Sequence, residues 1–342
     1  MERIRWGILG AGSIAHRFTA ALERVEDADL VAISGRNAER LAAFSRQHRV
    51  EEDKCYASSG DNGLRAHDRL LSDDDVDAVY VALPHGLHAA WSLRALRAGK
   101  AVLCEKPAVL SESQALEIAR AARESETLFM EAMKPRFTPV RERVAELIAS
   151  DELGAVTGMD VAHLLDYGEH LDGYLLDPEQ GGVLYDLGCY GLAWAEDILD
   201  GDVAVEWSEA SWIEGRCGAL VDIADEIRLR IGGVPVHLEF SGESRAYRVE
   251  CRIECERGSI LVPTFHRPSS LVVVREGGGP EVEELPLAFD DFYGEVAHFC
   301  DLMRAGVDES RIMPLSSTVR VARAIDAVRA AWGPRPVRGA LR

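Results

Sequence analysis

The sequence predicts an α/β protein in two parts: a doubly wound parallel sheet, then an α+β part with a large, mostly antiparallel open sheet. Over the first 130 residues, short and almost entirely apolar runs alternate with segments of helical period. This is typical of a parallel sheet covered on both faces. After about residue 150, apolar and polar residues alternate with a period of two, which indicates antiparallel strands with one buried face.

The first part is expected to run as alternating strands and helices. The strands are expected at Ile4–Leu9, Leu30–Ser34, Ala78–Leu83, Ala101–Cys104 and Leu128–Met130, and the helices at Ser13–Val25, Ala38–Gln47, His88–Ala98 and Ser111–Ser125. Ser111 and Gln114 have the spacing of a capping box, which marks the start of the last of these helices.

The sheet of the second part is predicted from residues 227–231, 234–240 and 247–255, in which every second residue is apolar. The other face of these strands carries arginine and glutamate. It is either a solvated face with weak cross-strand ion pairs or a charged interface between subunits.

Two helices, at Asp291–Arg304 and Ser316–Trp332, are expected to close the second part. We therefore expect a dinucleotide-binding domain at 1–130, a substrate-binding domain at 131–333 and a flexible tail at 334–342.

Composition excludes several classes of protein. With 342 residues, 47% of them hydrophobic, the chain can bury a sizeable core, so a disordered or fibrous protein is excluded. The formal net charge of −20 repels polyphosphates and anionic surfaces. Neither a nucleic acid nor a membrane is therefore expected as a partner.

The cysteines predict neither a disulfide framework nor a metal site. They are odd in number, scattered and without a C-x-x-C pair: Cys55, Cys104, Cys189, Cys217, Cys251, Cys255 and Cys300. The amino terminus shows no apolar signal region, and no stretch reaches the roughly 18 apolar residues of a membrane span. We expect a cytoplasmic protein.

A glycine-rich turn predicts the nucleotide site of a Rossmann domain. Gly10-Ala11-Gly12-Ser13-Ile14-Ala15 follows the first strand and opens the first helix, as the G-x-G-x-x-G/A pattern requires. Gly10 permits the tight turn, Gly12 lets the backbone approach a pyrophosphate, and Ala15 allows close helix–strand packing. Ser13 and Ile14 stand at the helix N-terminus, which offers N–H groups to the anion.

The residue after the second strand indicates which dinucleotide binds. An acidic side chain there would favour NAD, but the sequence has Arg36, 21 residues after Ala15, with Arg40 four residues further on. An arginine can grip a 2′-phosphate with two charge-assisted hydrogen bonds, which favours NADP. Stacking of Arg36 on adenine, with NAD bound, is the alternative.

Lys106 is singled out by its rarity and its position. The chain has 4 lysines against 34 arginines. Lys106 stands just beyond the carboxyl end of an expected strand, where open α/β sheets place their ligands. A lysine can change its protonation state there, whereas an arginine cannot.

From this point the sequence resembles a known family, named for glucose-fructose oxidoreductase, inositol dehydrogenase and rhizopine catabolism (Gfo/Idh/MocA). Glu105-Lys106-Pro107 at a strand exit is its hallmark. Further segments fit in order: Gly7–Ala15, Val81–His85 with His88, Glu131-Ala132 with Arg136-Phe137, Gly181–Tyr190, and Met313-Pro314. The resemblance covers essentially the whole chain.

The resemblance implies roles for residues at these motifs. Lys106 would contact the reacting hydroxyl or carbonyl, and the Lys106–Pro107 bond would be cis. Asp186 and Tyr190, four residues apart on an expected helix, would project from one face toward substrate. The nicotinamide side would be lined by these residues: Leu83, Pro84, His85, His88 and Glu105. Arg136 would lie near the cofactor or the substrate. Either histidine could instead cap the helix expected at His88–Ala98. His163 and Tyr167 could face the cleft, but no role is assigned to them.

Tyr190 indicates the branch of the family. The inositol-type branch has a histidine at this place, whereas the sugar-oxidoreductase and dihydrodiol-dehydrogenase branches have a tyrosine. A free phenol has a pKa near 10, and a neighbouring ammonium would lower it toward a value useful for proton exchange. Departures at Lys134-Pro135, Leu175 and Gln180 leave the substrate open.

The expected activity is hydride transfer between NADP, or NAD, and a sugar, cyclitol or related polyhydroxylated compound. Lys106 and Tyr190 would handle the substrate oxygen and its proton, with Asp186 in support. A homodimer or homotetramer through the open sheet is compatible with the family. The alternatives are a non-catalytic NADP(H)-binding sensor or scaffold, and a dehydrogenase of a non-sugar substrate such as a trans-dihydrodiol.

Overall fold

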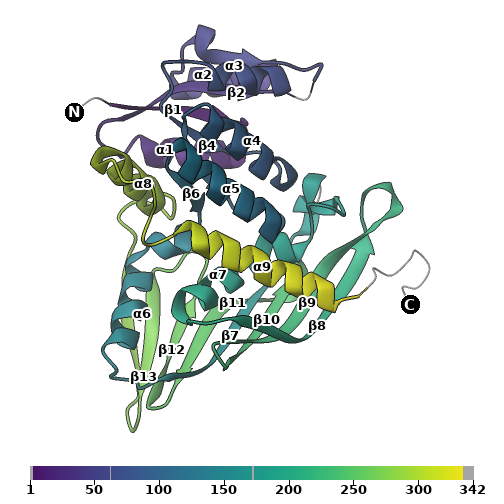
Figure 1. Cartoon of the computed structure of the whole chain (residues 1–342). Coiled ribbons are helices and arrows are strands. Elements are labelled where there is room, and N and C mark those ends of the chain that lie inside the picture. The colour runs from purple at the N-terminus through teal and green to yellow at the C-terminus, as the bar shows by residue number, and fades with distance from the viewer. Residues whose placement is uncertain (1–2, 62, 172, 334–342) are drawn as a thin grey trace. The chain divides into compact units, whose positions relative to one another are not determined.

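The chain forms two compact units, shown in Figure 1. This computed structural model describes residues 3–61, 63–171 and 173–333, so the expected flexible tail, 334–342, lies outside the described residues. The first unit contains Met1–Val109, Ser113–Ala132 and Ala288–Thr318. The second contains Leu110–Glu112, Met133–Leu287 and Val319–Arg342. Each unit is described by itself.

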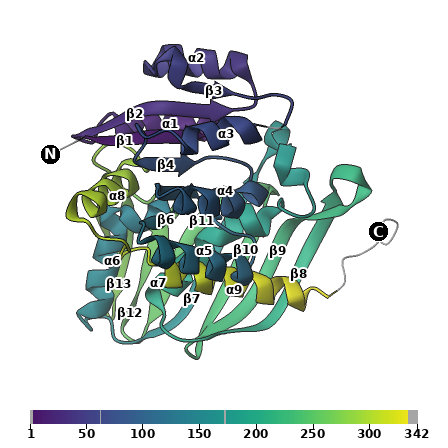
Figure 2. The ribbon, with the colours of Figure 1, turned by 45° about the horizontal axis from the view of Figure 1, so that its top comes forward.

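The first unit is built on a six-stranded sheet in the order β3-β2-β1-β4-β5-β6 (Figure 2). All of its neighbouring strands pair in parallel. The strands are β1 (Ile4–Leu9), β2 (Ala28–Gly35), β3 (Cys55–Ala57), β4 (Ala78–Val81), β5 (Ala101–Glu105) and β6 (Phe129–Ala132). The predicted doubly wound parallel sheet is confirmed.

The helices that connect these strands are α1 (Ser13–Leu22), α2 (Ala38–His48), α3 (Leu64–Leu71), α4 (His85–Arg97) and α5 (Glu112–Ser125), with the 3-10 turn η1 (Glu52–Lys54). A further helix, α8 (Tyr293–Ala305), comes from late in the chain, after β14. α1 meets α2 through the rings of His16 and Phe44, 4.5 Å apart. α3 meets α4 through His67 and Trp91, 4.8 Å apart.

The core of the first unit is centred on aromatic side chains. Phe18 of α1 stacks on Tyr80 of β4, with 4.0 Å between ring centroids. Trp6 of β1 is fully buried and touches both Phe18 and Phe299 of α8. The late helix α8 is therefore part of this core, beside α1 (Figure 1).

The second unit is built on an eight-stranded sheet in the order β14-β13-β12-β11-β7-β10-β9-β8. The pair β7 and β10 is parallel and the other pairs are antiparallel, which confirms a mostly antiparallel sheet. Its strands are β7 (Val156–Asp166), β8 (Val203–Glu214), β9 (Leu220–Ile231), β10 (Val234–Ser241), β11 (Glu243–Cys255), β12 (Gly258–Pro263), β13 (Ser270–Arg275) and β14 (Pro280–Glu284).

The helices α6 (Pro139–Ala149), α7 (Cys189–Ile198) and α9 (Leu315–Ala331) lie over one face of this sheet (Figure 1). The short turns η2 (Lys134–Phe137), η3 (Gly168–His170), η4 (Gly173–Leu176), η5 (Leu184–Gly188) and η6 (Arg216–Gly218) also belong to this unit. α7 lies close to the strands because Gly191 leaves room for Phe240, whose ring lies 2.9 Å from where a Cβ would be. Arg320 of α9 pairs with Glu196 of α7.

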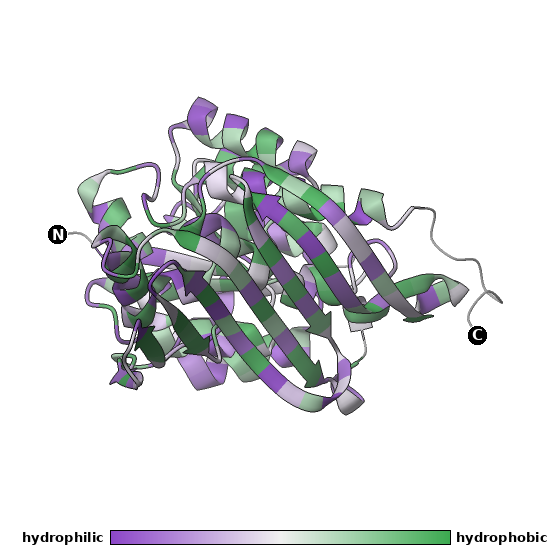
Figure 3. Ribbon diagram, turned by 90° about the horizontal axis from the view of Figure 1, so that it is seen from below, coloured by the Kyte–Doolittle hydropathy of each residue, from purple (hydrophilic) through white to green (hydrophobic). Residues whose placement is uncertain are grey.

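Along the strands of this sheet, hydrophobic and hydrophilic residues alternate, as the ribbon colours of Figure 3 show, and because successive side chains point to opposite faces, the polar ones gather on the face opposite the helices. One row of its polar residues is linked across strands. His237 of β10 lies 3.4 Å from the carboxylate of Asp160 in β7 and 3.3 Å from that of Glu226 in β9. Among the described residues, no helix combines the length and the apolar character that crossing a bilayer requires.

Candidate active site

The glycine-rich turn has the backbone that a pyrophosphate cradle needs. Gly10 has a φ of +103°, and a Cβ there would lie 2.4 Å from the carbonyl oxygen of Ala82. Glycine is therefore required by both conformation and space. Gly12 has an extended backbone and no atom within 4 Å of where its Cβ would be. A methyl group at Gly12 would project into this open space.

The N-terminus of α1 fits an anion. Gly12 is the N-cap of this helix and provides no side-chain cap, and the first turn contains no acidic residue. The first N–H groups and the helix dipole are thus available to a phosphate. Ser13 and Ile14 are exposed here, whereas Ala15 is fully buried against the sheet, as predicted for helix–strand packing. The residues present fit a dinucleotide.

Two arginines stand at the carboxyl end of β2. Arg36 directly follows the strand, and Arg40 lies in the first turn of α2, whose N-cap Asn37 accepts a hydrogen bond of 2.9 Å from the Arg40 N–H. Both side chains are exposed. Neither guanidinium faces a carboxylate in the described part of the chain, so both are available for an anionic ligand.

The loop after β4 carries residues that are predicted to line the nicotinamide. α4 starts at His85, a turn earlier than predicted, with Pro84 as its N-cap. Leu83 is half-buried, and His85 and His88 are buried. The two ring nitrogens of His88 lie against the backbone carbonyls of Leu83 and Pro107. Its imidazole thus joins the loops after β4 and β5. Its predicted contact with the cofactor stays a prediction.

The Glu105-Lys106-Pro107 segment leaves the end of β5 with a cis Lys106–Pro107 bond, as the resemblance implies. The hydroxyl of Tyr80 donates a hydrogen bond to Glu105, and the N–H of Lys106 lies 3.2 Å from the Oε2 atom of that carboxylate. Burial and Glu105 raise the pKa of Tyr80 well above its usual value, so this phenol remains a donor. Lys106 itself is half-buried.

Sequence reasoning did not assign the anchor of this loop, Glu131 in β6. Its buried carboxylate accepts hydrogen bonds from the N–H of Ala108, at 3.0 Å, and from the hydroxyl of Thr318, at 2.8 Å. Ala108 lies two residues after Lys106, so Glu131 fixes the backbone that follows the lysine. The sequence signal that could have pointed to this role is a single acidic residue within an apolar strand, because a buried carboxylate needs hydrogen-bond donors.

Asp186 and Tyr190 belong to the second unit. The predicted single α-helix is a π-helical segment, η5, that continues into α7, so Asp186 lies in the π turn and Tyr190 in the α-helix. π turns are frequent at functional sites. The hydroxyl of Tyr167 donates to Oδ2 of Asp186 at 2.6 Å. Burial and Asp186 raise the pKa of Tyr167 well above its usual value.

The ring of Tyr190 is buried among imidazoles. Its centroid lies 6.2 Å from that of His163 and 6.1 Å from that of His266, and these two histidines stack at 4.7 Å. Because Lys106 is in the first unit and Tyr190 in the second, their predicted meeting stays a prediction.

Arg136 takes part in a buried ion network of the second unit. Its guanidinium donates to the carbonyl of Ala193 at 2.7 Å and pairs with Glu196, which also pairs with Arg320. Arg136 follows Lys134-Pro135 in η2, and all three are buried. The predicted contact between Arg136 and the cofactor stays a prediction.

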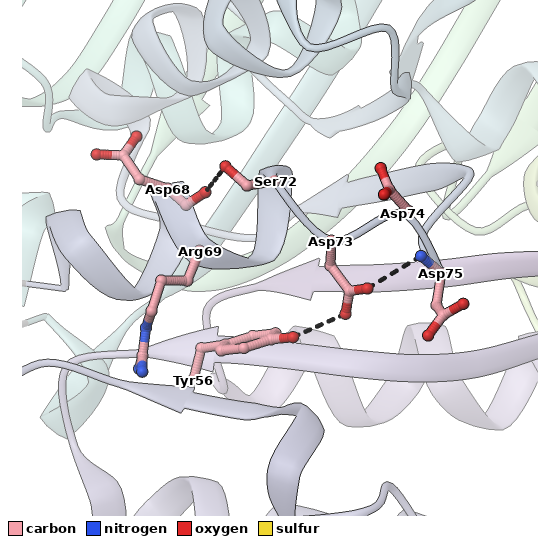
Figure 4. A pocket seen from close by; sticks show the side chains of 7 residues that line it. All are labelled: Tyr56, Asp68, Arg69, Ser72, Asp73, Asp74 and Asp75. Carbon is pink, nitrogen blue, oxygen red and sulfur yellow. Dashed lines mark hydrogen bonds between the residues drawn. The ribbon is translucent and has the colours of Figure 1, made fainter.

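A cavity of about 640 Å³ in the first unit is unsuited to a nucleotide. It lies where α3 ends and before β4 begins, and Figure 4 shows its lining residues: Tyr56, Asp68, Arg69, Ser72, Asp73, Asp74 and Asp75. Burial and the hydrogen bond to Asp73 raise the pKa of Tyr56 to about 12. The carboxylates would repel phosphate, and ligands of such sheets bind at the opposite, carboxyl ends of the strands.

Comparison with known proteins identifies both parts of the chain. Residues 4–133 match the model of the Gfo/Idh/MocA oxidoreductase family with an NAD-binding Rossmann fold, and residues 142–261 match a model of its C-terminal domain.

Similar proteins align over nearly their full length. The chain is 28% identical to trans-1,2-dihydrobenzene-1,2-diol dehydrogenase of Xenopus laevis, over 94% of this chain and 96% of that protein. It is 29% identical to D-xylose 1-dehydrogenase (NADP(+)) 2 of Haloferax volcanii, over 94% and 95%. The crystal structure of KijD10, a 3-ketoreductase from Actinomadura kijaniata, in complex with NADP and TDP-benzene matches with a TM-score of 0.83 and 27% identity, over 98% and 99%. With its glycine cradle and its cis Lys106–Pro107 loop, the chain is an NAD(P)-dependent oxidoreductase that belongs to the Gfo/Idh/MocA family.

Proposed function

We propose that this enzyme interconverts a hydroxyl and a carbonyl group on a sugar, cyclitol or related polyhydroxylated substrate, with NADP as its cofactor. The observation that carries the proposal is the Glu105-Lys106-Pro107 loop, which stands beyond the carboxyl end of a Rossmann strand and is anchored by Glu131. Relatives that act on D-xylose and on a dihydrodiol support the substrate class.

The amino-terminal residues would hold the cofactor. The backbone at Gly10 and Gly12 and the first N–H groups of α1 would bind the pyrophosphate, and the free guanidinium groups of Arg36 and Arg40 would bind the 2′-phosphate. When bound, the nicotinamide accepts or supplies the hydride.

Lys106 and Tyr190 would manage the substrate oxygen and its proton. The ammonium group of Lys106 donates a hydrogen bond to this oxygen and stabilises negative charge that develops on it. The phenol of Tyr190 exchanges the proton, and a nearby ammonium favours the phenolate form. Asp186, held by the hydroxyl of Tyr167, orients the substrate hydroxyl or Lys106.

The test is turnover by Lys106→Met and Tyr190→Phe enzymes. Reduced-nicotinamide absorbance is followed across a panel of aldoses, cyclitols and dihydrodiols, with the NADP dissociation constant measured in parallel. We expect kcat to fall by about 100-fold or more in each variant, while NADP still binds. Wild-type turnover by Lys106→Met would refute the proposed role of the lysine.

The same panel tests a second candidate, favoured by the dihydrodiol dehydrogenase relatives: a trans-dihydrodiol as substrate. A preference in kcat/KM for dihydrodiols over every sugar would establish it. NADP binding without turnover of any compound would instead favour a sensor or scaffold.

Self-association through the helix-free face of the eight-stranded sheet is proposed as the assembly. Charged residues of both signs on this face, such as Asp160, Glu226 and Arg228, offer complementary pairs to a second copy. A homodimer or homotetramer in light scattering, lost on reversing the charge of Arg228, supports this, and a monomer refutes it.

A cytoplasmic location is proposed from the thiols. All seven cysteines are unpaired, and Cys217 is exposed. Reduced thiols are typical of the cytoplasm. Cell fractionation tests this.

A further inference from the structure

A bulge in β9 brings two carboxyl groups to the same face of the eight-stranded sheet. Ser211 of β8 pairs with Ala224, but the next residue, Trp212, pairs with Asp222, so β9 has one additional residue, Ile223. Residues three apart in a regular strand point to opposite faces. Because the bulge adds one residue between them, Asp222 and Asp225 point to the same face instead, which is the face covered by helices.

Asp222 supports the start of the segment that carries Asp186 and Tyr190. Its Oδ2 atom accepts a hydrogen bond of 2.9 Å from the N–H of Leu184, the first residue of η5. Its carboxylate also lies so close to Gly182 that a Cβ there would be 2.1 Å from Oδ1. Val183, the N-cap residue, provides no side-chain cap. Asp222 of β9 therefore caps this N-terminus in place of Val183, and its negative charge is favourable at a helix N-terminus.

Asp225 lies in a different environment. Its side chain is buried, and within the described residues no donor faces either of its oxygens. Its polar neighbour is the carboxyl group of Asp222, three residues earlier on the same face of β9. Two negative charges this close together in a buried place repel each other, which favours a proton on one of the two carboxyl groups. Burial and the charge of Asp222 raise the pKa of Asp225 well above its usual value.

We propose that Asp222 and Asp225 share one proton, held by Asp225, and that this singly charged pair positions the π turn bearing Asp186 and the helix bearing Tyr190. Asp222 and Asp225 are thus positioning residues, and their effect on turnover rests on the proposed function of Asp186 and Tyr190. Loss of the proton would place two negative charges side by side beneath the turn and push Asp222 away from Leu184.

The groups around the two aspartates favour a proton on Asp225, because the residues opposite it carry no charge that would stabilise its carboxylate. Opposite Asp225 in register lie Ala210 of β8 and Phe240 of β10, which carry no charge. Burial raises the pKa of Tyr167, which directly follows β7, and of Tyr185 of η5, and both lie near enough to Asp222 for its charge to raise the pKa of each further.

Two further elements bring charged or titratable groups near these tyrosines. α9 contributes Arg329 and Asp326 beside Tyr185. Tyr174 of η4 and Asp186 lie beside Tyr167. These groups act on the tyrosines, whereas Asp225 responds to burial and to Asp222.

The first test uses Asp225→Asn, whose amide can donate to Asp222 as a protonated carboxyl does. Because the pKa of Asp225 is higher in the folded chain than in the unfolded chain, the folded chain binds more protons between the two values. The free energy of unfolding of the wild type therefore falls as the pH rises from the unfolded pKa of Asp225 to its folded pKa. Asp225→Asn lacks this part of the pH dependence, because asparagine does not titrate. We expect Asp225→Asn to equal or exceed the wild type in stability at neutral pH.

The infrared spectrum reports the proton directly. The wild type is expected to show the carbonyl band of a neutral carboxylic acid at neutral pH, and Asp225→Asn is expected to lose it. The matched control, Asp200→Asn, replaces an exposed aspartate of the same unit and is expected to leave the band in place. Absence of the band from the wild type, or a clear loss of stability in Asp225→Asn, would overturn the shared proton.

Turnover and its pH profile form the second test. We expect kcat/KM near the wild-type value for Asp225→Asn and Asp200→Asn, and about 100-fold lower for Asp222→Asn. The alkaline fall in kcat/KM should be smaller in Asp225→Asn than in the wild type. Equal damage in Asp222→Asn and Asp225→Asn, or none in Asp222→Asn, would overturn the positioning role. A wild type that turns over nothing would refute the proposed function while leaving the infrared result to stand.

Discussion

The Nδ1 atom of His88 lies 2.8 Å from the carbonyl oxygen of Pro107, and its Nε2 atom lies 2.6 Å from the carbonyl oxygen of Leu83. Both contacts need a proton on nitrogen, but a neutral imidazole carries one N–H. Burial, and to a smaller extent Lys106, lower the pKa of His88, so the neutral form prevails at physiological pH. One ring therefore joins the loops after β4 and β5 with one donated hydrogen bond at a time.

Substitutions of His88 can separate the two contacts. The amide nitrogen of asparagine can replace Nδ1 and reach Pro107, whereas that of glutamine can replace Nε2 and reach Leu83. Because Pro107 is bonded to Lys106, we expect His88→Asn to retain more activity than His88→Gln. His88→Leu should lose most, about tenfold in kcat/KM. Steady-state kinetics and NADP titration check this order, and wild-type kinetics in His88→Leu would contradict it.

Arg36 should set the preference for NADP over NAD. Its exposed guanidinium, with no carboxylate partner in the described ranges, can form charge-assisted hydrogen bonds with a 2′-phosphate. Losing these should weaken NADP binding by about tenfold to 100-fold in Arg36→Ala and leave NAD binding nearly unchanged. The dissociation constants are measured by fluorescence titration. Arg46→Ala, which replaces an exposed arginine of α2, the helix that follows Arg36, is the control. Equal weakening of both dinucleotides would argue for stacking on adenine.

His67 should make the protein less stable in mild acid. Its imidazole is buried beside Trp91, and Nδ1 lies 2.7 Å from the hydroxyl of Ser34. Burial lowers the pKa of His67 to about 4. Between this value and the unfolded value near 6.5, the unfolded chain binds a proton that the folded chain does not. The free energy of unfolding therefore falls as pH drops through that window, by roughly 3 kcal/mol in total.

The measurement is urea unfolding at a series of pH values in the wild type and in His67→Asn. The variant should lose this part of the pH dependence, because asparagine does not titrate there. His170→Asn, which replaces an exposed histidine, is the control. An unchanged slope in His67→Asn would show that other groups cause the acid sensitivity.

The sequence predicted elements well where one strong physical signal dominated. The strand at Ile4–Leu9 is reproduced with the same bounds, since every residue from Trp6 to Leu9 is buried. By contrast, β3 and α3 were not expected. β3 is three half-buried residues long, and α3 is a short helix with Arg65, Asp68 and Arg69 among its eight residues. Neither is long or apolar enough to show a clear period.

The motifs of the candidate site could be predicted from the sequence, but the hydrogen bonds that hold the site residues in place could not. The glycines are marked in the sequence by their pattern between a strand and a helix, and Lys106 by its rarity and its position after a strand. Tyr167 was noted without a role, because its hydrogen bond to Asp186 joins residues nineteen apart in sequence. The contact between Asp222 and Leu184 depends on a bulge, and nothing in the local alternation marks one extra residue.

Gly10 and Gly12, two residues apart, should respond to alanine in opposite ways. At Gly12 the backbone has a φ of −85°, and an added Cβ meets nothing within 4 Å, so Gly12→Ala should fold with unchanged or slightly higher stability. At Gly10 the φ of +103° and the nearby carbonyl of Ala82 are both incompatible with a side chain. Gly10→Ala should therefore lose about 2 kcal/mol or more of unfolding free energy.

Gly12→Ala should weaken cofactor binding although it leaves folding unaffected. The methyl group of Gly12→Ala occupies the space in which a pyrophosphate approaches the helix, so NADP binding should weaken by about 100-fold while the apo protein melts normally. Melting curves with and without NADP measure both effects, since a ligand that binds the folded protein raises its melting temperature by an amount that grows with the logarithm of the ligand concentration divided by Kd. A Gly12→Ala protein with a wild-type NADP shift would mean that the dinucleotide does not lie against this turn.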